Sequence, residues 1–201
     1  MTVHIRLAQD LDADAITDIY RPVVESTIIS FEADPPERAE MARRIHDTLR
    51  TYPWLVREID GRVAGYAYAA GHRVRSAYQW SVDTSVYIDE GHRRCGVGRG
   101  LYDSLFVILA AQGYTNAYAG IALPNPASVA IHESVGFERI GVYQGVGYKL
   151  GRWCDVGWWQ RSLRERPQSP RPPQAMAAVA QQPGWQELLR RGESLVRTQS
   201  A

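Results

Sequence analysis

The sequence predicts a single α/β domain followed by a short C-terminal tail. Segments with the alternating or continuous apolar character of β-strands are interspersed with segments whose apolar residues recur every three or four positions, as in amphipathic helices. The chain has 201 residues, of which 45% are hydrophobic, so it can bury one sizeable core but not comfortably two. We expect the domain at residues 1–165 and a Pro-rich tail at residues 166–201.

The composition argues against several classes of partner. The net charge is +1, which gives no global attraction to nucleic acid or to an anionic membrane. No apolar run approaches the roughly 20 residues of a membrane span, and MTVHIRLAQD lacks the layout of a signal peptide. Cys95 and Cys154 alone cannot form a structural zinc site, and no metal-binding motif is present. We therefore expect a cytoplasmic protein with reduced thiols, no metal, and neither nucleic acid nor membrane as a partner.

The N-terminal part of the domain is predicted to contain a strand and two helices. Residues 3–7 form the strand, and Asp10 can cap the first helix, which ends before residues 26–31 break its pattern. The apolar face of that helix consists of Ile16, Ile19, Tyr20 and Val23. Two prolines precede the second helix, whose buried stripe consists of Met41, Ile45 and Leu49.

A β-hairpin and a further strand are predicted next. The strand-like runs WLVREI and RVAGYAYA flank Asp60-Gly61, a dipeptide typical of a two-residue hairpin turn. Residues 72–79 form a polar connection, and residues 82–88 form the next strand.

The rest of the domain alternates between helices and strands. Residues 101–113 form a helix that stops at Gly113, and residues 114–122 form a strand. Pro124 and Pro126 open another helix, which ends at Gly136. Two final strands are expected at about 139–149 and 152–162.

The tail differs in composition from the domain. QSPRPPQ cannot build a regular element, and AMAAVAQQPG is weakly structured. WQELLRRGESLV, residues 185–196, can form a short amphipathic helix. Two alternatives are open: the last part docks on the body or on a second subunit, or the tail is mobile.

The stretch HRRCGVGRGL, residues 92–101, lies between a predicted strand and a predicted helix, where glycines and basic residues are typical of phosphate binding. A Walker loop needs Lys after its last glycine, whereas Arg99 follows Gly98. A dinucleotide fingerprint needs G-x-G-x-x-G and an acid at the end of the next strand, which instead ends in IAL. The motif R-x-x-G-x-G remains, in which backbone N–H groups and a helix N-terminus face a pyrophosphate and arginines add charge-assisted bonds.

This turn resembles the coenzyme A loop of the GCN5-related N-acetyltransferase (GNAT) superfamily. Residues 85–88 are similar to the family's splayed strand, whose backbone binds the pantetheine arm, and NPASVAIHESVGF is similar to its second signature. The resemblance implies acetyl-CoA as the co-substrate. The residues expected to bind it are Val86, Tyr87, Ile88, Arg93, Arg94, Cys95, Gly96, Val97, Gly98, Arg99, Asn125, Ser128 and His132. Cys95 is expected to fill the loop rather than to carry the acyl group.

Longer blocks resemble the phosphinothricin and methionine sulfoximine N-acetyltransferases within this superfamily. These blocks are YPWLV (52–56), AYQWSVDTSVYI (77–88), ALPNPASVAIHESVGF (122–137) and GRWCDVGWWQ (151–160). The resemblance runs from about residue 3 to about residue 163. It implies the GNAT fold, a mixed and mostly antiparallel central sheet with helices on both faces and a V-shaped opening between the fourth and fifth strands. It also implies a homodimer.

Two residues are candidates for proton transfer in direct acetylation of an amine. Asp83 lies where the resemblance puts a carboxylate, and it would deprotonate the amine directly or through a water. Its alternative role is to form a cap or turn. His132 occupies a position where many superfamily members have tyrosine, and it would protonate the leaving sulfur or take a proton from the amine. Its alternative role is to pack against or bond the cofactor.

Arg73 and Arg75 are alternate residues of an extended segment, so both guanidinium groups can face one ligand. They suit a substrate with a carboxylate, phosphinyl or sulfonyl oxygen, although solvated surface arginines are the alternative. With Phe31, Trp80 and Asp83 they form the expected substrate site. Trp153, Trp158 and Trp159 are expected in the core or a subunit interface.

The predicted function is acetyl-CoA-dependent N-acetylation of a small amino-acid-like substrate, such as phosphinothricin, methionine sulfoximine or methionine sulfone. This prediction follows from the resemblance and from the two arginines. Two alternatives stay open: a protein or peptide N-acetyltransferase, and a non-catalytic acyl-CoA-binding regulator.

Overall fold

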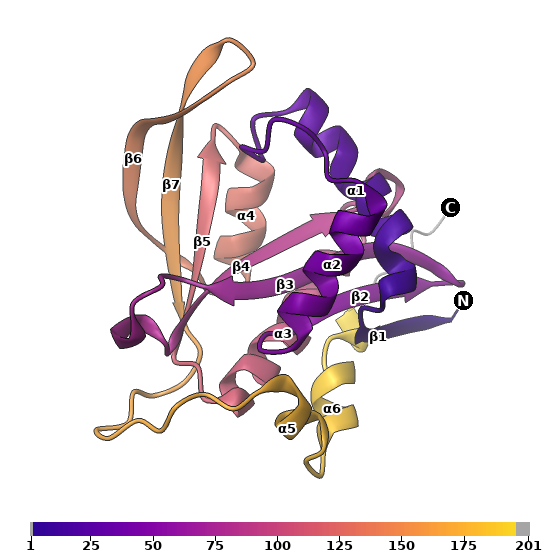
Figure 1. The fold of residues 1–201 in the computed structure, drawn as a ribbon, viewed down its shortest axis with the longest axis vertical. Coiled ribbons are helices and arrows are strands. Elements are labelled where there is room, and N and C mark those ends of the chain that lie inside the picture. The colour runs from indigo at the N-terminus through magenta and orange to yellow at the C-terminus, as the bar shows by residue number, and fades with distance from the viewer. Residues whose placement is uncertain (1, 196–201) are drawn as a thin grey trace.

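The computed structural model describes residues 2–195, which contain one seven-stranded sheet in the order β1-β2-β3-β4-β5-β7-β6 (Figure 1). All neighbouring strands are antiparallel except β4 and β5, which are parallel. The strands are β1 (Val3–Leu7), β2 (Trp54–Ile59), β3 (Arg62–Gly71), β4 (Ser81–Ile88), β5 (Asn116–Leu123), β6 (Glu138–Lys149) and β7 (Arg152–Ser162). The predicted mixed, mostly antiparallel sheet is therefore confirmed.

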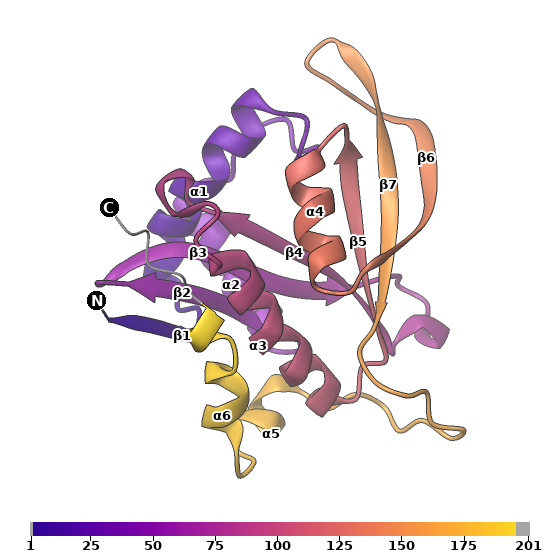
Figure 2. The ribbon, with the colours of Figure 1, turned by 180° about the vertical axis from the view of Figure 1, so that it is seen from behind.

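Helices cover both faces of the sheet, as predicted. One face carries α1 (Ala13–Ser26) and α2 (Arg38–Leu49), and the other carries α3 (Val97–Gln112) and α4 (Pro126–Ser134) (Figures 1 and 2). Apolar residues of α1 and α2 pack with Trp54 and Tyr66 in one core cluster. Those of α3 pack with Ala67 and Val82 in a second cluster on the opposite face.

Two turns behave as their residues predict. In the β2–β3 hairpin, Asp60 and Gly61 have φ angles of 48° and 79°, as a two-residue hairpin turn requires. At the end of α3, Gly113 has a φ of 106°, and its N–H donates to the carbonyl groups of Leu109 and Ala110. The predicted hairpin and the predicted helix end are both confirmed.

Two predicted helix starts are wrong. A single 3₁₀ turn at Asp10–Asp12 precedes α1, so Asp10 does not cap the helix. Instead the Asp12 carboxylate accepts a hydrogen bond from the Gln9 N–H at 2.8 Å. α3 begins at Val97, earlier than residue 101, because Gly96 with a φ of 81° turns the chain into the helix there.

Residues 166–172 are exposed, whereas residues 173–195 lie against the body of the protein. They contain α5 (Met176–Ala180), α6 (Trp185–Arg190) and a 3₁₀ turn at Glu193–Leu195, next to α3 and β1 (Figure 2). α5 lies within the segment predicted to be weakly structured, and its Met176 and Val179 are buried. The predicted helix at 185–196 begins as α6, and its last residue, Val196, lies outside the described residues.

Among residues 2–195, no helix is long and apolar enough to cross a membrane.

Candidate functional site

The sheet opens between β4 and β5. Their parallel pairing runs from Ser81–Asn116 to Asp83–Tyr118 and then stops, because the two strands diverge (Figure 1). On the side of β4 that faces the gap, the backbone groups beyond Asp83 therefore have no partner from β5. The predicted V-shaped opening between the fourth and fifth strands is confirmed, and Asp83 lies at its apex.

Asp83 forms a close pair with His72, a residue that the sequence reasoning did not select. The His72 Nδ1 lies 2.6 Å from Asp83 Oδ1. The His72 N–H donates to the Ser81 carbonyl at 3.4 Å, so the β3–β4 pairing continues one residue beyond β3. Since side chains two positions apart on a strand share a face, His72 and Asp83 meet diagonally across the hairpin.

The two side chains of this pair differ in exposure. The His72 side chain is 12% exposed and that of Asp83 is 34% exposed. Burial raises the pKa of the Asp83 carboxyl above its ordinary value, while the hydrogen bond from His72 and the charge of Arg73 act in the opposite direction. The carboxyl at the apex therefore holds a proton more strongly than an exposed aspartate.

Aromatic rings fix the imidazole of His72. The ring stacks on Tyr118 with 4.2 Å between centroids, and it meets Trp158 edge-on at 5.9 Å. The guanidinium of Arg73 lies 5.5 Å from the centre of the Trp158 ring. These contacts come from β5, β7 and the 72–79 connection, so both arms of the opening hold the histidine.

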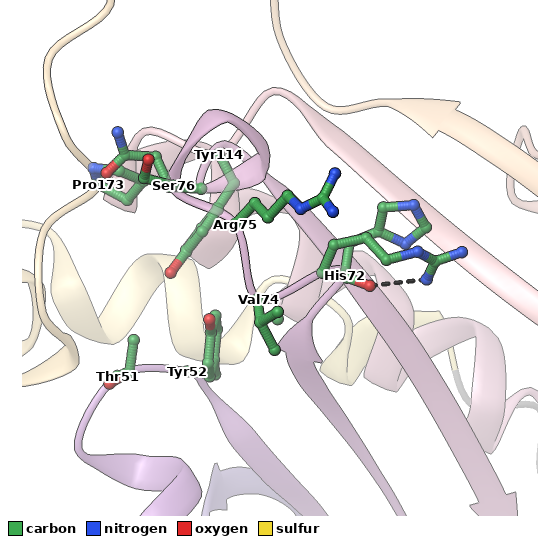
Figure 3. A pocket seen from close by; sticks show the side chains of 11 residues that line it. Thr51, Tyr52, His72, Val74, Arg75, Ser76, Tyr114 and Pro173 are labelled. Atoms are coloured by element: carbon green, nitrogen blue, oxygen red, sulfur yellow. Dashed lines mark hydrogen bonds between the residues drawn. The ribbon is translucent and has the colours of Figure 1, made fainter.

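Arg73 and Arg75 line one cavity together with His72 and with Val74, which lies between them (Figure 3). The cavity has a volume of about 680 Å³. Figure 3 shows His72 at one end of the lining side chains and Thr51 and Pro173 towards the other. Arg73 Nη1 also donates to the His72 carbonyl at 2.8 Å, which steadies this segment.

The connection between α1 and α2 reaches across the opening to β6. A side chain at Gly147 of β6 would clash with the ring of Phe31, which is 44% exposed. Lys149 Nζ donates to the carbonyl groups of Val24 and Ser30 at 2.6 and 2.7 Å. Phe31 therefore lies where the α1–α2 connection contacts β6, on the other arm of the opening.

Trp80 lies apart from the other candidate substrate residues. Its indole Nε1 donates to the carbonyl of Arg171 in the tail at 2.9 Å. Trp80 immediately precedes β4 and is three positions from Asp83, so the two side chains point to opposite faces of the sheet. The geometry gives Trp80 a role in holding the tail.

The predicted coenzyme turn leads from β4 into α3. Arg93, Arg94 and Arg99 are exposed around it, and Gly96 has the left-handed backbone that directs the chain into the helix. Gly98 also has a packing function that its motif did not suggest. A Cβ there would lie 2.5 Å from Ile131 Cδ1 of α4, so Gly98 allows α3 and α4 to pack closely. The Cys95 thiol is 3.4 Å from the Arg93 carbonyl within the loop.

Asn125, Ser128 and His132 organise α4 from within the protein. Asn125 Oδ1 accepts from the Ser128 N–H at 3.1 Å and so caps the helix. His132 is only 4% exposed, with Nδ1 at 2.7 Å from the Ser128 carbonyl and Nε2 at 2.8 Å from the Tyr102 hydroxyl. Burial lowers the pKa of His132. With both ring nitrogens engaged, the geometry favours the alternative of a packing histidine over proton transfer.

Comparisons with known proteins identify relatives of the chain. The family model described as "Acetyltransferase (GNAT) domain" matches residues 5–158. The phosphinothricin N-acetyltransferase of Streptomyces viridochromogenes is 41% identical over 170 residues, which cover 85% of this chain and 92% of that protein. The L-methionine sulfoximine/L-methionine sulfone acetyltransferase of Salmonella typhimurium is 35% identical over 164 residues, which cover 80% of this chain and 95% of that protein.

Solved structures share the fold. A phosphinothricin acetyltransferase from Sinorhizobium meliloti in complex with AcCoA matches with a TM-score of 0.78 and 35% identity, covering 86% of this chain and 97% of that one. A putative acetyltransferase from Salmonella typhimurium with its cofactor acetyl-CoA matches with a TM-score of 0.80 and 32% identity, covering 85% and 99%. The family match ends at residue 158, before the tail.

Proposed function

The chain belongs to the GNAT acetyltransferases, and from this premise we propose that it transfers the acetyl group of acetyl-CoA directly to the amino group of a small amino-acid-like substrate. The observation that carries the proposal is the His72–Asp83 pair at the apex of the opening between β4 and β5. Relatives named for phosphinothricin, methionine sulfoximine and methionine sulfone support compounds of this type as substrates.

The opening and the turn before α3 fit acetyl-CoA. β4 offers backbone groups of Val86, Tyr87 and Ile88, which lie beyond its pairing with β5. The first turn of α3 offers N–H groups for a pyrophosphate, and the exposed arginines of the turn add positive charge. Asn125 and Ser128 begin α4 on the other arm. When bound there, acetyl-CoA supplies the thioester that the amine attacks.

Asp83 is the proposed base. An amine is present at neutral pH mainly as ammonium, so it must lose a proton before it can attack a carbonyl carbon. Since burial raises the pKa of Asp83, this carboxylate accepts a proton more readily than an exposed one. Backbone N–H groups of residues 86–88 would stabilise the negative charge that develops on the carbonyl oxygen.

We assign His132 a structural role in this proposal. Its bonds to Tyr102 of α3 and to the Ser128 carbonyl of α4 hold the two helices together. These helices carry the residues proposed to bind the coenzyme, so His132 acts on binding through their position.

Arg73 and Arg75 are proposed to recognise the anionic end of the substrate. Both line the cavity that His72 also lines, so a carboxylate or sulfonyl oxygen bound there lies near the Asp83 pair. Guanidinium groups bind such oxygens with paired hydrogen bonds. Phe31 supplies an apolar wall at the other side of the opening.

We also propose a homodimer, formed through the outer face of β6 and β7. Exposed apolar side chains gather on this hairpin, including Trp153 at 70% and Tyr148 at 63% exposure, whereas Trp159 of β7 is in the core. A second copy of the chain would cover this surface. Trp153→Arg should give a monomer by light scattering, while Leu11→Arg, at an equally exposed site far from the hairpin, should not.

The two free cysteines fit the reducing cytoplasm in which we place the protein.

Thiol release from acetyl-CoA tests the proposed reaction. The acceptors are phosphinothricin, methionine sulfoximine, methionine sulfone, ordinary amino acids and a lysine peptide. We expect turnover with the first three, lost in Arg75→Ala and retained in Arg62→Ala, an exposed arginine at the start of β3. Turnover with the peptide alone would instead indicate a protein acetyltransferase. Binding of acetyl-CoA without turnover would indicate a regulator.

A further inference from the structure

Contacts with aromatic rings and a backbone hydrogen bond hold the imidazole of His72 in one position. Its ring is stacked against Tyr118, meets the edges of Trp158 and Tyr78, and is 12% exposed. Its backbone is fixed by the bond to the Ser81 carbonyl. The imidazole therefore cannot leave Asp83 without breaking contacts on both arms of the opening.

The chemistry of the two side chains decides the direction of their hydrogen bond. An ionised carboxylate can only accept, so Nδ1 of His72 carries the hydrogen and donates it to Asp83 Oδ1 over 2.6 Å. A carboxylate has two oxygens, and only Oδ1 is engaged in this bond. The Asp83 side chain is still 34% exposed, and its other oxygen, Oδ2, accepts no hydrogen bond from the described residues.

We propose that His72 is the positioning residue of the proton-accepting group: its Nδ1–H fixes Oδ1 of Asp83 and thereby aims Oδ2 at the substrate amine. The inference rests on the proposed acetylation and specifies which atom takes the proton. In the step, one N–H bond of the ammonium breaks and an O–H bond forms at Oδ2. The electron pair left on nitrogen is then available to attack the acetyl carbon.

The other charged and titratable groups around the pair affect its response to pH. Arg73 lowers the pKa of Asp83 from the 72–79 connection, where Tyr78 also lies. Tyr118 faces the pair from β5, and Tyr68 faces it from β3. Beyond Tyr68, Glu32 and Arg44 form an ion pair at 2.8 Å and offset each other. His72 is therefore the only group among the described residues that both touches Asp83 and donates to it.

Two substitutions separate positioning from simple packing. His72→Phe keeps an aromatic ring for Tyr118 but has no donor for Asp83. His72→Asn loses the ring but places an amide N–H near the position of Nδ1. His46→Phe, on the exposed face of α2, is the matched control. In each protein we would measure the pH profile of kcat/KM, the KM for acetyl-CoA, and the carboxyl ¹³C titration of Asp83.

We expect His72→Phe to move the acid limb of kcat/KM, and the carbon titration of Asp83, upward by about one pH unit, because the carboxylate loses its donor. Below this limb, activity should fall roughly tenfold, with an unchanged KM for acetyl-CoA. His72→Asn should restore most of the wild-type profile, and His46→Phe should not differ from wild type.

A loss of activity that is uniform across pH, without recovery in His72→Asn, would overturn the inference. If the wild type shows no turnover, the proposed function fails, and the carbon titration still tests His72. In that case an unchanged Asp83 titration in His72→Phe overturns the positioning role, and an upward shift supports it.

Discussion

Asp83 is subject to two opposing electrostatic effects. Burial at the apex disfavours its charged form, whereas the donor of His72 and the charge of Arg73 favour it. The pKa is nevertheless raised, so burial is the larger effect. Burying the ionised Asp83 carboxylate therefore lowers the stability of the folded protein, as is typical of groups that exchange protons in a functional site.

Asp83→Asn should therefore separate activity from stability. We expect it to reduce kcat by about 10²-fold or more, as the loss of a general base does. A raised folded-state pKa means that the wild-type contribution of Asp83 to stability is present at low pH and is lost as pH rises through that pKa. The asparagine variant lacks this loss, so its melting temperature relative to wild type should increase as pH rises from about 3.9, the ordinary aspartate pKa, to neutral pH. A variant that becomes relatively less stable over this range would show that the bond to His72 outweighs burial.

His132 should show the opposite linkage. Burial lowers its pKa, so the folded state disfavours the imidazolium form, and stability is lost as pH falls below the ordinary histidine value of about 6.5. His132→Leu removes the partner of the buried Tyr102 hydroxyl, which should cost about 1–3 kcal/mol at pH 8. Urea unfolding at pH 8 and pH 5.5 measures both effects, because the variant should lose less stability than wild type between the two values. Equal losses would indicate that another group dominates acid unfolding.

Sequence reasoning found Asp83 but not its partner. Asp83 was selected because the family resemblance places a carboxylate at its position. His72 was not selected because it lies in a polar connection whose sequence predicts neither a strand nor a site. The register of the hairpin supplies the missing information: His72 continues the pairing opposite Ser81, and Asp83 lies two residues further along the same face. Once the register of two antiparallel strands is known, the residues that lie opposite a histidine at the end of one strand can be identified on the other. The burial of His132 depends on the packing of α3 on α4, which no local pattern specifies.

At the scale of elements, the turn into α3 combines two functions in two glycines that are separated by one residue. Gly96 supplies a backbone with positive φ, and Gly98 supplies the close contact with Ile131 of α4. The motif on the sequence suggested one function for both, the approach of backbone to phosphate. Only the first glycine therefore tests the geometry of the proposed coenzyme turn without disturbing helix packing.

Gly96→Ala should weaken acetyl-CoA binding through backbone strain. A side chain at φ 81° costs about 1 kcal/mol, and a turn that relaxes to avoid this strain no longer aims its N–H groups. We expect the KM for acetyl-CoA to rise roughly fivefold, which corresponds to that energy, with a smaller change in kcat. Gly61→Ala is the matched control, because Gly61 has a φ of 79°, has open space around it, and lies in the β2–β3 turn. If both variants change KM equally, the turn does not hold the coenzyme.

The elements with a strong pattern were predicted well, including the bounds of several strands, whereas two helix starts were misplaced. The β2–β3 hairpin was predicted from two strand-like runs about Asp60-Gly61, and the structure has this turn at the same two residues. The start of α1 was misplaced because a 3₁₀ turn and an α-helix have similar preferences in the first turn. The opening between β4 and β5 came from resemblance, since the divergence of two strands has no signature in either strand.

At the scale of the whole molecule, the tail joins parts that are far apart in the sequence. It bonds Trp80 through the Arg171 carbonyl and Gln112 of α3 through the Gln174 carbonyl. It then reaches β1 (Figure 2), where the Glu193 carboxylate accepts a hydrogen bond from the Ile5 N–H. Arg57 of β2 is the centre of this arrangement. Its guanidinium is buried and donates to the carbonyl groups of Gly192 and Glu193, and burial lowers its pKa to about 10.

The docking of the tail was one of two open alternatives because the sequence shows an amphipathic segment but not its receptor. Arg57 is a charged residue near the end of β2, and no pattern in the sequence around it indicates that its side chain is buried. We propose that residues 166–195 are a fixed support for α3 and β1 that lies beyond the family match. The support acts on stability, and its Pro173 also lines the cavity that Arg73 and Arg75 line.

A double-mutant cycle between Arg57 and the tail tests this arrangement. Deleting residues 166–201 removes both carbonyl partners of the Arg57 guanidinium and the core contacts of Met176 and Leu189, so the free energy of unfolding should fall by about 3 kcal/mol or more. Arg57→Leu in the full chain should cost about 1–3 kcal/mol, because two carbonyl groups then lose their donor. In the shortened chain the same substitution should cost less, since the guanidinium there has no tail carbonyl groups to bind. Urea unfolding of the four proteins gives the coupling energy. Costs that simply add would show that Arg57 and the tail are independent.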